Sequence, residues 1–298
     1  MKKNLLSIND LSKADVEKIF KLTDRLKNKR TNDLKGKNLA LIFQKPSTRT
    51  KVSFEVAINQ LGGNAISLNW NELQLGRGET VEDTARVLER YVNAIIARVF
   101  SHDDLVKTSK VTKIPVINAL SDFEHPCQAL ADLYTIKKKF GFFRNLKLAY
   151  VGDGNNVCNS LVLACSIVGL KLTVATPKGY EPNSLILKQA KKLAKDAIIL
   201  THNPVEAVKN AQIVYTDTWI SMHQEKERLE RLKIFKPFQV NKNLVSYASR
   251  NYVFMHDLPA KRGSEVVSEI IDGPHSIVFQ QAENRLHVQK GLLYYLLK

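Results

Sequence analysis

The chain has 298 residues, of which 44% are hydrophobic and 25% charged, and its formal net charge at pH 7 is +16. This composition is that of a globular protein and excludes a mostly disordered chain, and the length fits one large domain or two of about 150 residues. Apolar runs are short, so we expect no transmembrane helix, and the basic first residues lead into no apolar secretory signal. The three cysteines (Cys127, Cys158 and Cys165) are too few for a disulfide framework and lack metal-ligand spacing, which favours a reducing, cytoplasmic setting.

Short strands alternate with helices through the first half of the chain. Residues 38–44 form a mainly apolar run typical of a buried strand, and residues 49–61 carry apolar residues at helical spacing before a Gly-Gly pair. Further strands are predicted at 65–70, 94–100 and 115–120, and further helices at 81–91, 103–110 and 128–140. This alternation predicts βα units and a parallel sheet.

The same alternation starts again after Gly141. Strands are predicted at 146–151, 172–175, 198–200, 213–216 and 252–256, and helices at 156–168, 183–195, 265–271 and 279–297. We therefore predict an α/β protein with two domains, each a parallel sheet flanked by helices, and a C-terminal helix that returns towards the N-terminal domain. The predicted domains are residues 1–140 with the C-terminal helix 279–298, and residues 141–278.

A basic, hydroxyl-rich segment, Lys45-Pro46-Ser47-Thr48-Arg49-Thr50-Lys51, connects the first predicted strand to its helix. A helix start offers free N–H groups and the positive end of the helix dipole, while the hydroxyls and the arginine add further donors. The segment therefore predicts a phosphate site, although a Ser/Thr helix cap beside an incidental arginine is the simpler alternative. It is not a Walker loop, because the glycines of that pattern are absent.

Four other segments are weaker candidates when each is taken alone. His125, just before the helix at 128–140, can stabilise a developing oxyanion or move a proton, but a structural histidine is the commoner case. The loop 152–156 disfavours a nicotinamide cofactor, because Val157 replaces the third glycine of the dinucleotide fingerprint. Asp217 either pairs with a substrate ammonium or caps a helix, and Arg285 is either a surface residue or an anion ligand. Cys127 is expected to be packed in the interior.

In this order and spacing, the motifs resemble those of the aspartate/ornithine carbamoyltransferase family. Ser47-Thr48-Arg49-Thr50 and His125-Pro126-Cys127-Gln128 resemble its carbamoyl phosphate site, and Asp217-x-x-x-Ser221-Met222 resembles its ornithine-type motif. The resemblance covers nearly the whole chain. It implies a carbamoyl phosphate domain, an ornithine domain and a homotrimer with active sites at subunit interfaces. It also implies carbamoyl transfer to the δ-amine of L-ornithine, giving L-citrulline and phosphate in arginine biosynthesis, with no metal or organic cofactor.

The same resemblance assigns roles to residues by matching position. For carbamoyl phosphate it implies Ser47, Thr48, Arg49, Thr50, Gln74, Arg98, His125, Gln128, Leu258 and Arg285. For ornithine it implies Asn156, Asp217, Ser221, Met222 and Asp257. Gln74 would reach the site of the neighbouring subunit. Arg98, His125 and Asp257 would be catalytic, the first two by stabilising the carbamoyl oxygen as it gains charge.

Three positions depart from the family pattern. Asp257 stands where the motif H-C-L-P has a cysteine, Lys51 stands where arginine is usual, and His223 stands where glycine commonly follows Ser-Met. A carboxylate beside an ammonium favours the charged amine, which opposes attack, but it can also accept the proton of that amine. Our hypothesis is that Asp257 is a general base. The alternative is that it caps the following turn and that only the backbone near Leu258 serves the substrate.

Two other functions compete with this interpretation. Asp257 leaves open carbamoyl transfer to another amine, such as putrescine, lysine or an N-acylated ornithine, whereas Asp217 with Ser221 and Met222 favours a free amino acid. The basic net charge is compatible with nucleic-acid binding, but no run of five basic residues and no interleaved aromatic residues accompany it. We therefore expect small-molecule substrates, and neither nucleic acid nor a membrane, as partners.

Overall fold

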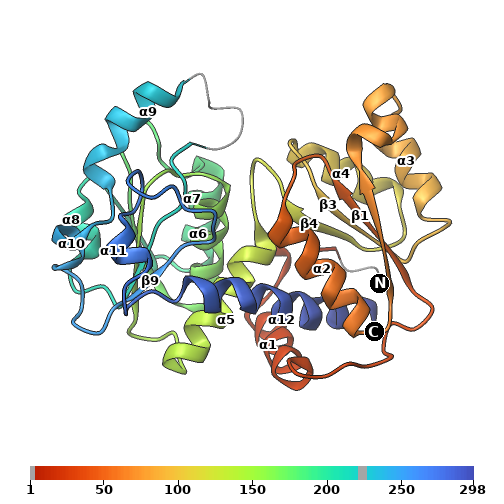
Figure 1. The fold of residues 1–298 in the computed structure, drawn as a ribbon, viewed down its shortest axis with the longest axis horizontal. Helices are drawn as coiled ribbons and strands as arrows, with labels where there is room; N and C mark the ends of the chain where they lie inside the picture. Colours follow the sequence, from red (N-terminus) through yellow and green to blue (C-terminus); the bar gives the residue numbers. More distant parts are fainter. Residues whose placement is uncertain (1–3, 221–226) are drawn as a thin grey trace. The chain divides into compact units, whose positions relative to one another are not determined.

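The computed structural model describes residues 4–220 and 227–298 and divides the chain into two compact units (Figure 1). Unit 1 comprises Met1–Tyr134 with Glu283–Lys298, and unit 2 comprises Thr135–Ala282. Two helices, α5 (Pro126–Phe140) and α12 (Val278–Leu297), contain residues of both units. None of the helices in the described part of the chain combines the length and the apolar character that a membrane span needs.

Unit 1 is built on a four-stranded parallel sheet with the strand order β2-β1-β3-β4. Its strands are β1 (Asn38–Phe43), β2 (Asn64–Asn69), β3 (Ala94–Arg98) and β4 (Val116–Leu120). Most residues of β1, β3 and β4 are buried, as expected for strands covered on both faces, and the edge strand β2 is more exposed. The order reverses at β1, because β2 and β3 pair with it on opposite sides. In open parallel sheets, ligands bind beyond the carboxyl ends of the strands at such a reversal.

Four further helices and three 3₁₀ turns complete this unit. They are α1 (Lys13–Leu26), α2 (Thr48–Gln60), α3 (Val81–Leu88), α4 (His102–Val111), η1 (Ile8–Asp10), η2 (Trp70–Glu72) and η3 (Gln74–Arg77). Ser12 caps α1 in a capping box with Asp15. The last turns of α12 pack closely against α1, since a Cβ atom on Gly291 would lie 2.3 Å from Thr23 Oγ1.

Unit 2 has a five-stranded parallel sheet with the order β7-β6-β5-β8-β9. Its strands are β5 (Lys147–Val151), β6 (Lys171–Ala175), β7 (Ile198–Thr201), β8 (Ile213–Tyr215) and β9 (Val253–Met255). Its other elements are α6 (Asn156–Val168), α7 (Ser184–Leu193), α8 (Pro204–Val208), α9 (Arg228–Phe235), η5 (Lys236–Phe238), α10 (Lys242–Val245) and α11 (Ser268–Ile271). The order reverses at β5, which lies between β6 and β8. The loops after β5 and β8 are therefore the expected ligand-binding edge.

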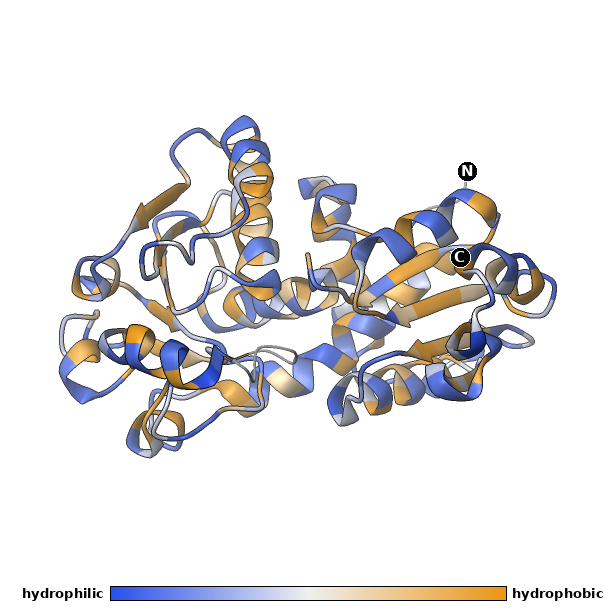
Figure 2. Ribbon diagram, turned by 90° about the horizontal axis from the view of Figure 1, so that it is seen from above, coloured by the Kyte–Doolittle hydropathy of each residue, from blue (hydrophilic) through white to orange (hydrophobic). Residues whose placement is uncertain are grey.

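The predicted fold class is confirmed: each unit is a parallel sheet flanked by helices, and the chain ends in a helix. Figure 2 shows the hydrophobic residues gathered along the strands and on parts of the helices. The sequence pattern misses the helices α1, α8, α9 and α10. The helix expected at 265–271 begins only at Ser268, because Glu265 is completely buried and faces His256 instead.

Candidate functional site

In unit 1 the loop after β1 forms an anion cradle at the start of α2. Ser47 is the N-cap of this helix, and its hydroxyl accepts a hydrogen bond from the Thr50 amide at 3.3 Å. Thr48 is exposed, Arg49 is half-buried, and the first turn holds no acidic residue. The N–H groups and the positive end of the helix dipole therefore act together with a guanidinium group.

Two more arginines meet at the hydroxyl of Thr50, which is completely buried. Nη2 of Arg285, from α12, donates to Thr50 Oγ1 at 2.5 Å, and Nη1 of Arg98, at the end of β3, donates to it at 3.4 Å. The register of the sheet shifts between Ala97 and Arg98. This arrangement concentrates positive charge at one point, and an anion with several oxygens, such as phosphate, would balance it.

Lys45 brings a further cation to the same loop. Its side chain is nearly buried, and its Nζ lies 4.5 Å from the centroid of the Phe100 ring. Burial, and then the charge of Arg98, lowers the pKa of Lys45. A bound anion would counter this effect, because an opposite charge stabilises the ammonium form.

His125 and Gln128 lie at the start of α5 and are both buried. The Gln128 amide donates to the His125 carbonyl at 3.1 Å, and Gln128 Nε2 donates to Asp132 Oδ1 at 2.9 Å. The second bond orients the side chain of Gln128, whose Oε1 has no hydrogen-bond partner among the described residues. Such an oriented acceptor suits an N–H donor in a ligand.

Cys127, between these two residues, is packed in the interior as expected. Its Sγ donates to the Asn118 carbonyl at 3.3 Å, and burial raises the pKa of the thiol to about 12. Cys127 therefore remains a thiol at neutral pH and is no nucleophile.

Gln74 begins the exposed turn η3, and its carbonyl accepts a hydrogen bond from the Glu79 amide at 3.1 Å. A groove of about 480 Å³ lies beside the anion cradle and reaches from Ser47 and Thr48 to Asn69 and Asn71. The cradle is therefore open to a ligand or to another chain on this side.

In unit 2, the loops after β5 and β8 are joined by a hydrogen bond between side chains. Asn155 Nδ2 donates to Asp217 Oδ2 at 2.7 Å, and the Thr218 amide donates to Asp217 Oδ1 at 2.6 Å. Asn155 also caps α6, through amide groups that donate to its Oδ1. Asn156, the predicted ornithine ligand, is the first residue of α6 and is half-buried. Asn155 is thus a site residue that the sequence does not single out.

Asp217, His256 and Asp257 form a buried cluster whose polar atoms lie within 4.8 Å of one another. Burial, and then the charge of Asp257, raises the pKa of Asp217 well above its ordinary value. Nδ1 of His256 lies 3.4 Å from Asp257 Oδ1, and its Nε2 lies 3.3 Å from Glu265 Oε1. This is the only group of three such ligand types within the described residues. We interpret the group as part of a hydrogen-bonded network, in which Asn155 and the Thr218 amide each donate to one oxygen of Asp217.

The protonation of His256 follows from its neighbours. Burial lowers the pKa of His256, but hydrogen bonds that the carboxylates of Asp257 and Glu265 accept from its ring outweigh this effect and raise the pKa to about 10. Against this, the Leu258 amide points at Nδ1 at 2.9 Å, a contact that requires Nδ1 without a proton. The contact is shorter than the one to Asp257, so we assign the neutral ring with its proton on Nε2, towards Glu265.

Leu258 holds a left-handed backbone conformation with a φ of 61°. Such a conformation is unusual for a residue with a branched side chain and is found where the surrounding structure imposes it, often at functional sites. Ser221 and Met222, which the sequence also predicts as ligands, lie outside the described residues.

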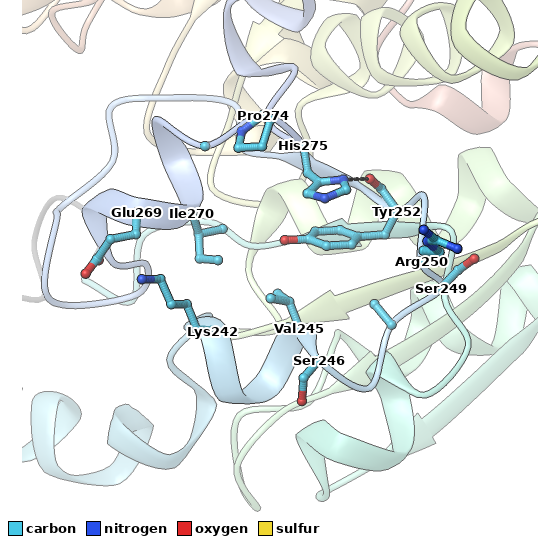
Figure 3. Close-up of a pocket in the computed structure, with 12 residues that line it drawn as sticks. Lys242, Val245, Ser246, Ser249, Arg250, Tyr252, Glu269, Ile270, Pro274 and His275 are labelled. Atoms are coloured by element: carbon cyan, nitrogen blue, oxygen red, sulfur yellow. Dashed lines mark hydrogen bonds between the residues drawn. The ribbon is translucent and has the colours of Figure 1, made fainter.

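A cavity of about 360 Å³ in unit 2 lies elsewhere, between α10, Tyr252 and the loop at Pro274 (Figure 3). Figure 3 shows the ring of His275 stacked on that of Tyr252, with a centroid distance of 4.4 Å. None of the predicted site residues that the structure describes lines this cavity. We therefore place the candidate site at the strand ends and not in this cavity.

Comparisons with known proteins identify the family that the chain resembles. Residues 3–138 match the family profile described as aspartate/ornithine carbamoyltransferase, carbamoyl-P binding domain, and residues 144–296 match its Asp/Orn binding domain. The ornithine carbamoyltransferase of Thermococcus kodakarensis is 53% identical over 299 residues, which are 98% of this chain and 95% of the relative. That of Methanocaldococcus jannaschii is 49% identical over 300 residues, which are 98% of each chain.

Solved structures show the same likeness. The ornithine carbamoyltransferase from Pyrococcus furiosus has a TM-score of 0.96 and 52% identity, covering 99% of this chain and 97% of that chain. The enzyme from Thermus thermophilus has a TM-score of 0.92 and 45% identity, and the match covers 100% of both chains.

Proposed function

The chain belongs to the aspartate/ornithine carbamoyltransferase family, and from this premise we propose that it transfers the carbamoyl group of carbamoyl phosphate to the δ-amine of L-ornithine. The products are L-citrulline and phosphate. In this proposal unit 1 binds carbamoyl phosphate and unit 2 binds ornithine. The observation that carries the proposal is the convergence of Arg98 and Arg285 on Thr50 beside the start of α2.

The phosphate group would bind to the anion cradle. Ser47, Thr48 and Thr50 supply hydroxyl and amide donors, and Arg49 supplies a guanidinium group that lowers the energy of the leaving phosphate. Arg285 completes the positive charge around Thr50.

The carbamoyl group would lie between Arg98 and the start of α5. Gln128 Oε1, held by the bond to Asp132, accepts a hydrogen bond from the carbamoyl N–H. Thr50, Arg98 and His125 stabilise the carbamoyl oxygen, which gains negative charge as the amine attacks. No covalent enzyme intermediate is needed, because the amine is itself the nucleophile.

Ornithine would be bound by unit 2 through Asn156, Asp217, Ser221 and Met222. An ornithine δ-amine resembles a lysine side chain, whose pKa is about 10.4, so most of it is protonated at pH 7. Asp257 is placed beside Asp217 and His256 and would accept this proton, with the strained backbone at Leu258 assisting. Asp257 therefore takes the place of the family cysteine as the residue that serves the amine.

We also propose a homotrimer in which Gln74 acts at the site of the neighbouring subunit. The exposure of Gln74 and the groove beside the anion cradle support this arrangement. The three cysteines are free thiols, which supports a location in the cytoplasm. The relative from Pyrococcus furiosus is described as an anabolic ornithine carbamoyltransferase, which supports a role in arginine biosynthesis, and the one from Thermoplasma volcanium as a catabolic one.

The test is a citrulline assay with carbamoyl phosphate and L-ornithine, run beside putrescine, L-lysine and N-acetylornithine with detection of each ureido product. Turnover on ornithine far above the other amines is the expected result. Preference for another amine would refute the ornithine assignment and direct attention to Asp257 and His223. Growth without arginine of a host that lacks its own ornithine carbamoyltransferase would test the biosynthetic role.

A further inference from the structure

One buried arginine of α9 contacts two loops of the ornithine half-site. Nε of Arg231 donates to the Trp219 carbonyl at 2.7 Å, and its Nη2 forms an ion pair with the carboxylate of Asp153. The guanidinium carbon lies 4.9 Å from the centroid of the Tyr180 ring and 5.0 Å from that of Phe235. Only 4% of the Arg231 side chain is exposed. We call Asp153, Trp219 and Arg231 the arginine clamp.

The clamp holds the two loops at defined points. Asp153 lies two residues before Asn155 in the loop after β5, and Trp219 lies two residues after Asp217 in the loop after β8. The Asp153 carbonyl accepts a hydrogen bond from Tyr150 Oη at 2.8 Å, which fixes the same loop from the side of the sheet. Arg231 therefore contacts both of the loops that are joined by the Asn155–Asp217 hydrogen bond, one through Asp153 and the other through Trp219.

Charge alone does not account for this arrangement. A buried ion pair contributes little net stability, because both ions lose their hydration. The planar guanidinium instead provides donors in fixed directions, which match one backbone carbonyl and one carboxylate at the same time. This geometry constrains the distance between the two loops.

We propose that Arg231 and Asp153 are positioning residues that set the separation of Asn155 and Asp217 and so determine the affinity of the site for the amino-acid substrate. This inference rests on the proposed function and names residues that neither the sequence motifs nor the comparisons assign. Arg231 does not touch the substrate in this arrangement. It acts through the two loops.

The surroundings of Asp153 also make the clamp sensitive to pH. Burial raises the pKa of Asp153 to about 6, although the charge of Arg231 opposes this rise. Among the described residues, the other titratable groups that interact with Asp153 are Glu227 next to α9, Tyr150 on β5 and Cys158 on α6. As pH falls through about 6, Asp153 gains a proton and the ion pair loses one of its charges.

The first test compares the variants Arg231→Met, Arg231→Lys and Asp153→Asn with wild type. We expect Arg231→Met to raise KM for ornithine about tenfold or more, because the variant loses hydrogen bonds of a charged group. KM for carbamoyl phosphate should stay within about twofold of the wild-type value. Arg231→Lys keeps the positive charge but lacks the planar, forked set of N–H donors of a guanidinium group. This variant should therefore recover only part of the affinity for ornithine. Arg228→Met, an exposed arginine of the same helix, is the matched control and should behave as wild type.

Equal changes in both KM values, or full recovery by lysine, would overturn the positioning role. A second measurement, which needs no substrate, distinguishes a failure of the clamp from a failure of the proposed function. In a Trp70→Phe background, Trp219 is the only tryptophan, and its fluorescence reports on the clamp without any substrate. We expect its emission to change with a midpoint near pH 6 and the change to be absent in Asp153→Asn.

A wild-type protein without turnover on ornithine would refute the proposed function, and the fluorescence titration would still test the clamp. A flat titration, or one that persists in Asp153→Asn, would overturn the pH sensitivity of the clamp, and the two KM values would still decide its positioning role. Thermal unfolding of each variant identifies those that fail to fold. If Arg231→Met fails to fold, Arg231→Lys and Asp153→Asn still test the proposal through the two KM values.

Discussion

The hydroxyl of Thr50 lies 2.5 Å from Nη2 of Arg285, although the two residues are 235 positions apart in the chain. Both belong to unit 1, because the last part of α12 packs there. The C-terminal helix therefore contributes a charged group to an anion cradle that is otherwise built from the first strands. A loss of this helix would remove that group as well as packing against α1.

The Thr50 hydroxyl gives the first prediction. Thr50→Val keeps the shape of the side chain but removes the acceptor for both arginines, so we expect KM for carbamoyl phosphate to rise about 10- to 100-fold. KM for ornithine should change far less. Steady-state kinetics with each substrate varied in turn measures both. Thr112→Val, which removes a hydroxyl that donates to the Thr108 carbonyl at the end of α4, is the matched control. Unchanged kinetics in Thr50→Val would exclude Thr50 from the carbamoyl phosphate site.

The sequence predicts which loops carry the candidate sites where those loops follow strands. The carboxyl ends of parallel strands meet at one edge of a sheet, so the loops after β1, β5 and β8 could be recognised as candidates before their geometry was known. The family resemblance then singled out individual side chains such as Arg98 and Asp217. The segment carrying Ser221 and Met222 lies outside the described residues and remains a prediction.

Local sequence patterns do not predict contacts between residues that are far apart in the chain. Arg231 lies in a charged stretch that resembles a solvated helix face, yet its side chain is buried against aromatic rings. Asn155 rather than Asn156 bonds Asp217, and the choice depends on where α6 begins. Glu265 lies outside the expected helix and faces His256, which is nine residues earlier in the loop after β9. In each case the partner is set by the tertiary fold and not by neighbouring residues.

The second prediction concerns Asp257 as a base. Asp257→Asn preserves the size of the side chain but cannot accept the amine proton, so kcat should fall about 100-fold or more, the usual contribution of a general base. The loss should be smaller at high pH, where more ornithine carries a neutral δ-amine. Full turnover of Asp257→Asn across the pH range would exclude the base role and leave only the backbone at Leu258. Asp272→Asn, an exposed carboxylate paired with Arg262, is the control.

The third prediction concerns Asp217, which lies beside Asp257. The charge of Asp257 helps burial to raise the pKa of Asp217. Asp257→Cys places a thiol there, which is neutral at acid pH, so the pKa of Asp217 should fall towards its ordinary value. Since Asp217 must be ionised to hold an ammonium group, the acid limb of kcat/KM for ornithine should move to lower pH. A limb that stays in place or moves to higher pH would show that Asp257 does not set the ionisation of Asp217.

The last prediction tests the shared site. If Gln74 acts in the neighbouring subunit, Gln74→Ala and Asp217→Asn should each be nearly inactive as homotrimers. Co-expressed, they should form mixed trimers in which a Gln74→Ala subunit supplies Asp217 and its neighbour supplies Gln74. With random assembly about a quarter of the sites would then be complete, which sets the activity expected relative to wild type. The matched control is co-expression of Asp217→Asn with Thr50→Val. Both changes lie in the same subunit's share of the site, so no mixed trimer contains a complete site and this pair should not restore activity. Activity of the Gln74 mixture no higher than that of its parents, or a single-chain mass in light scattering, would contradict a site completed by a neighbouring subunit.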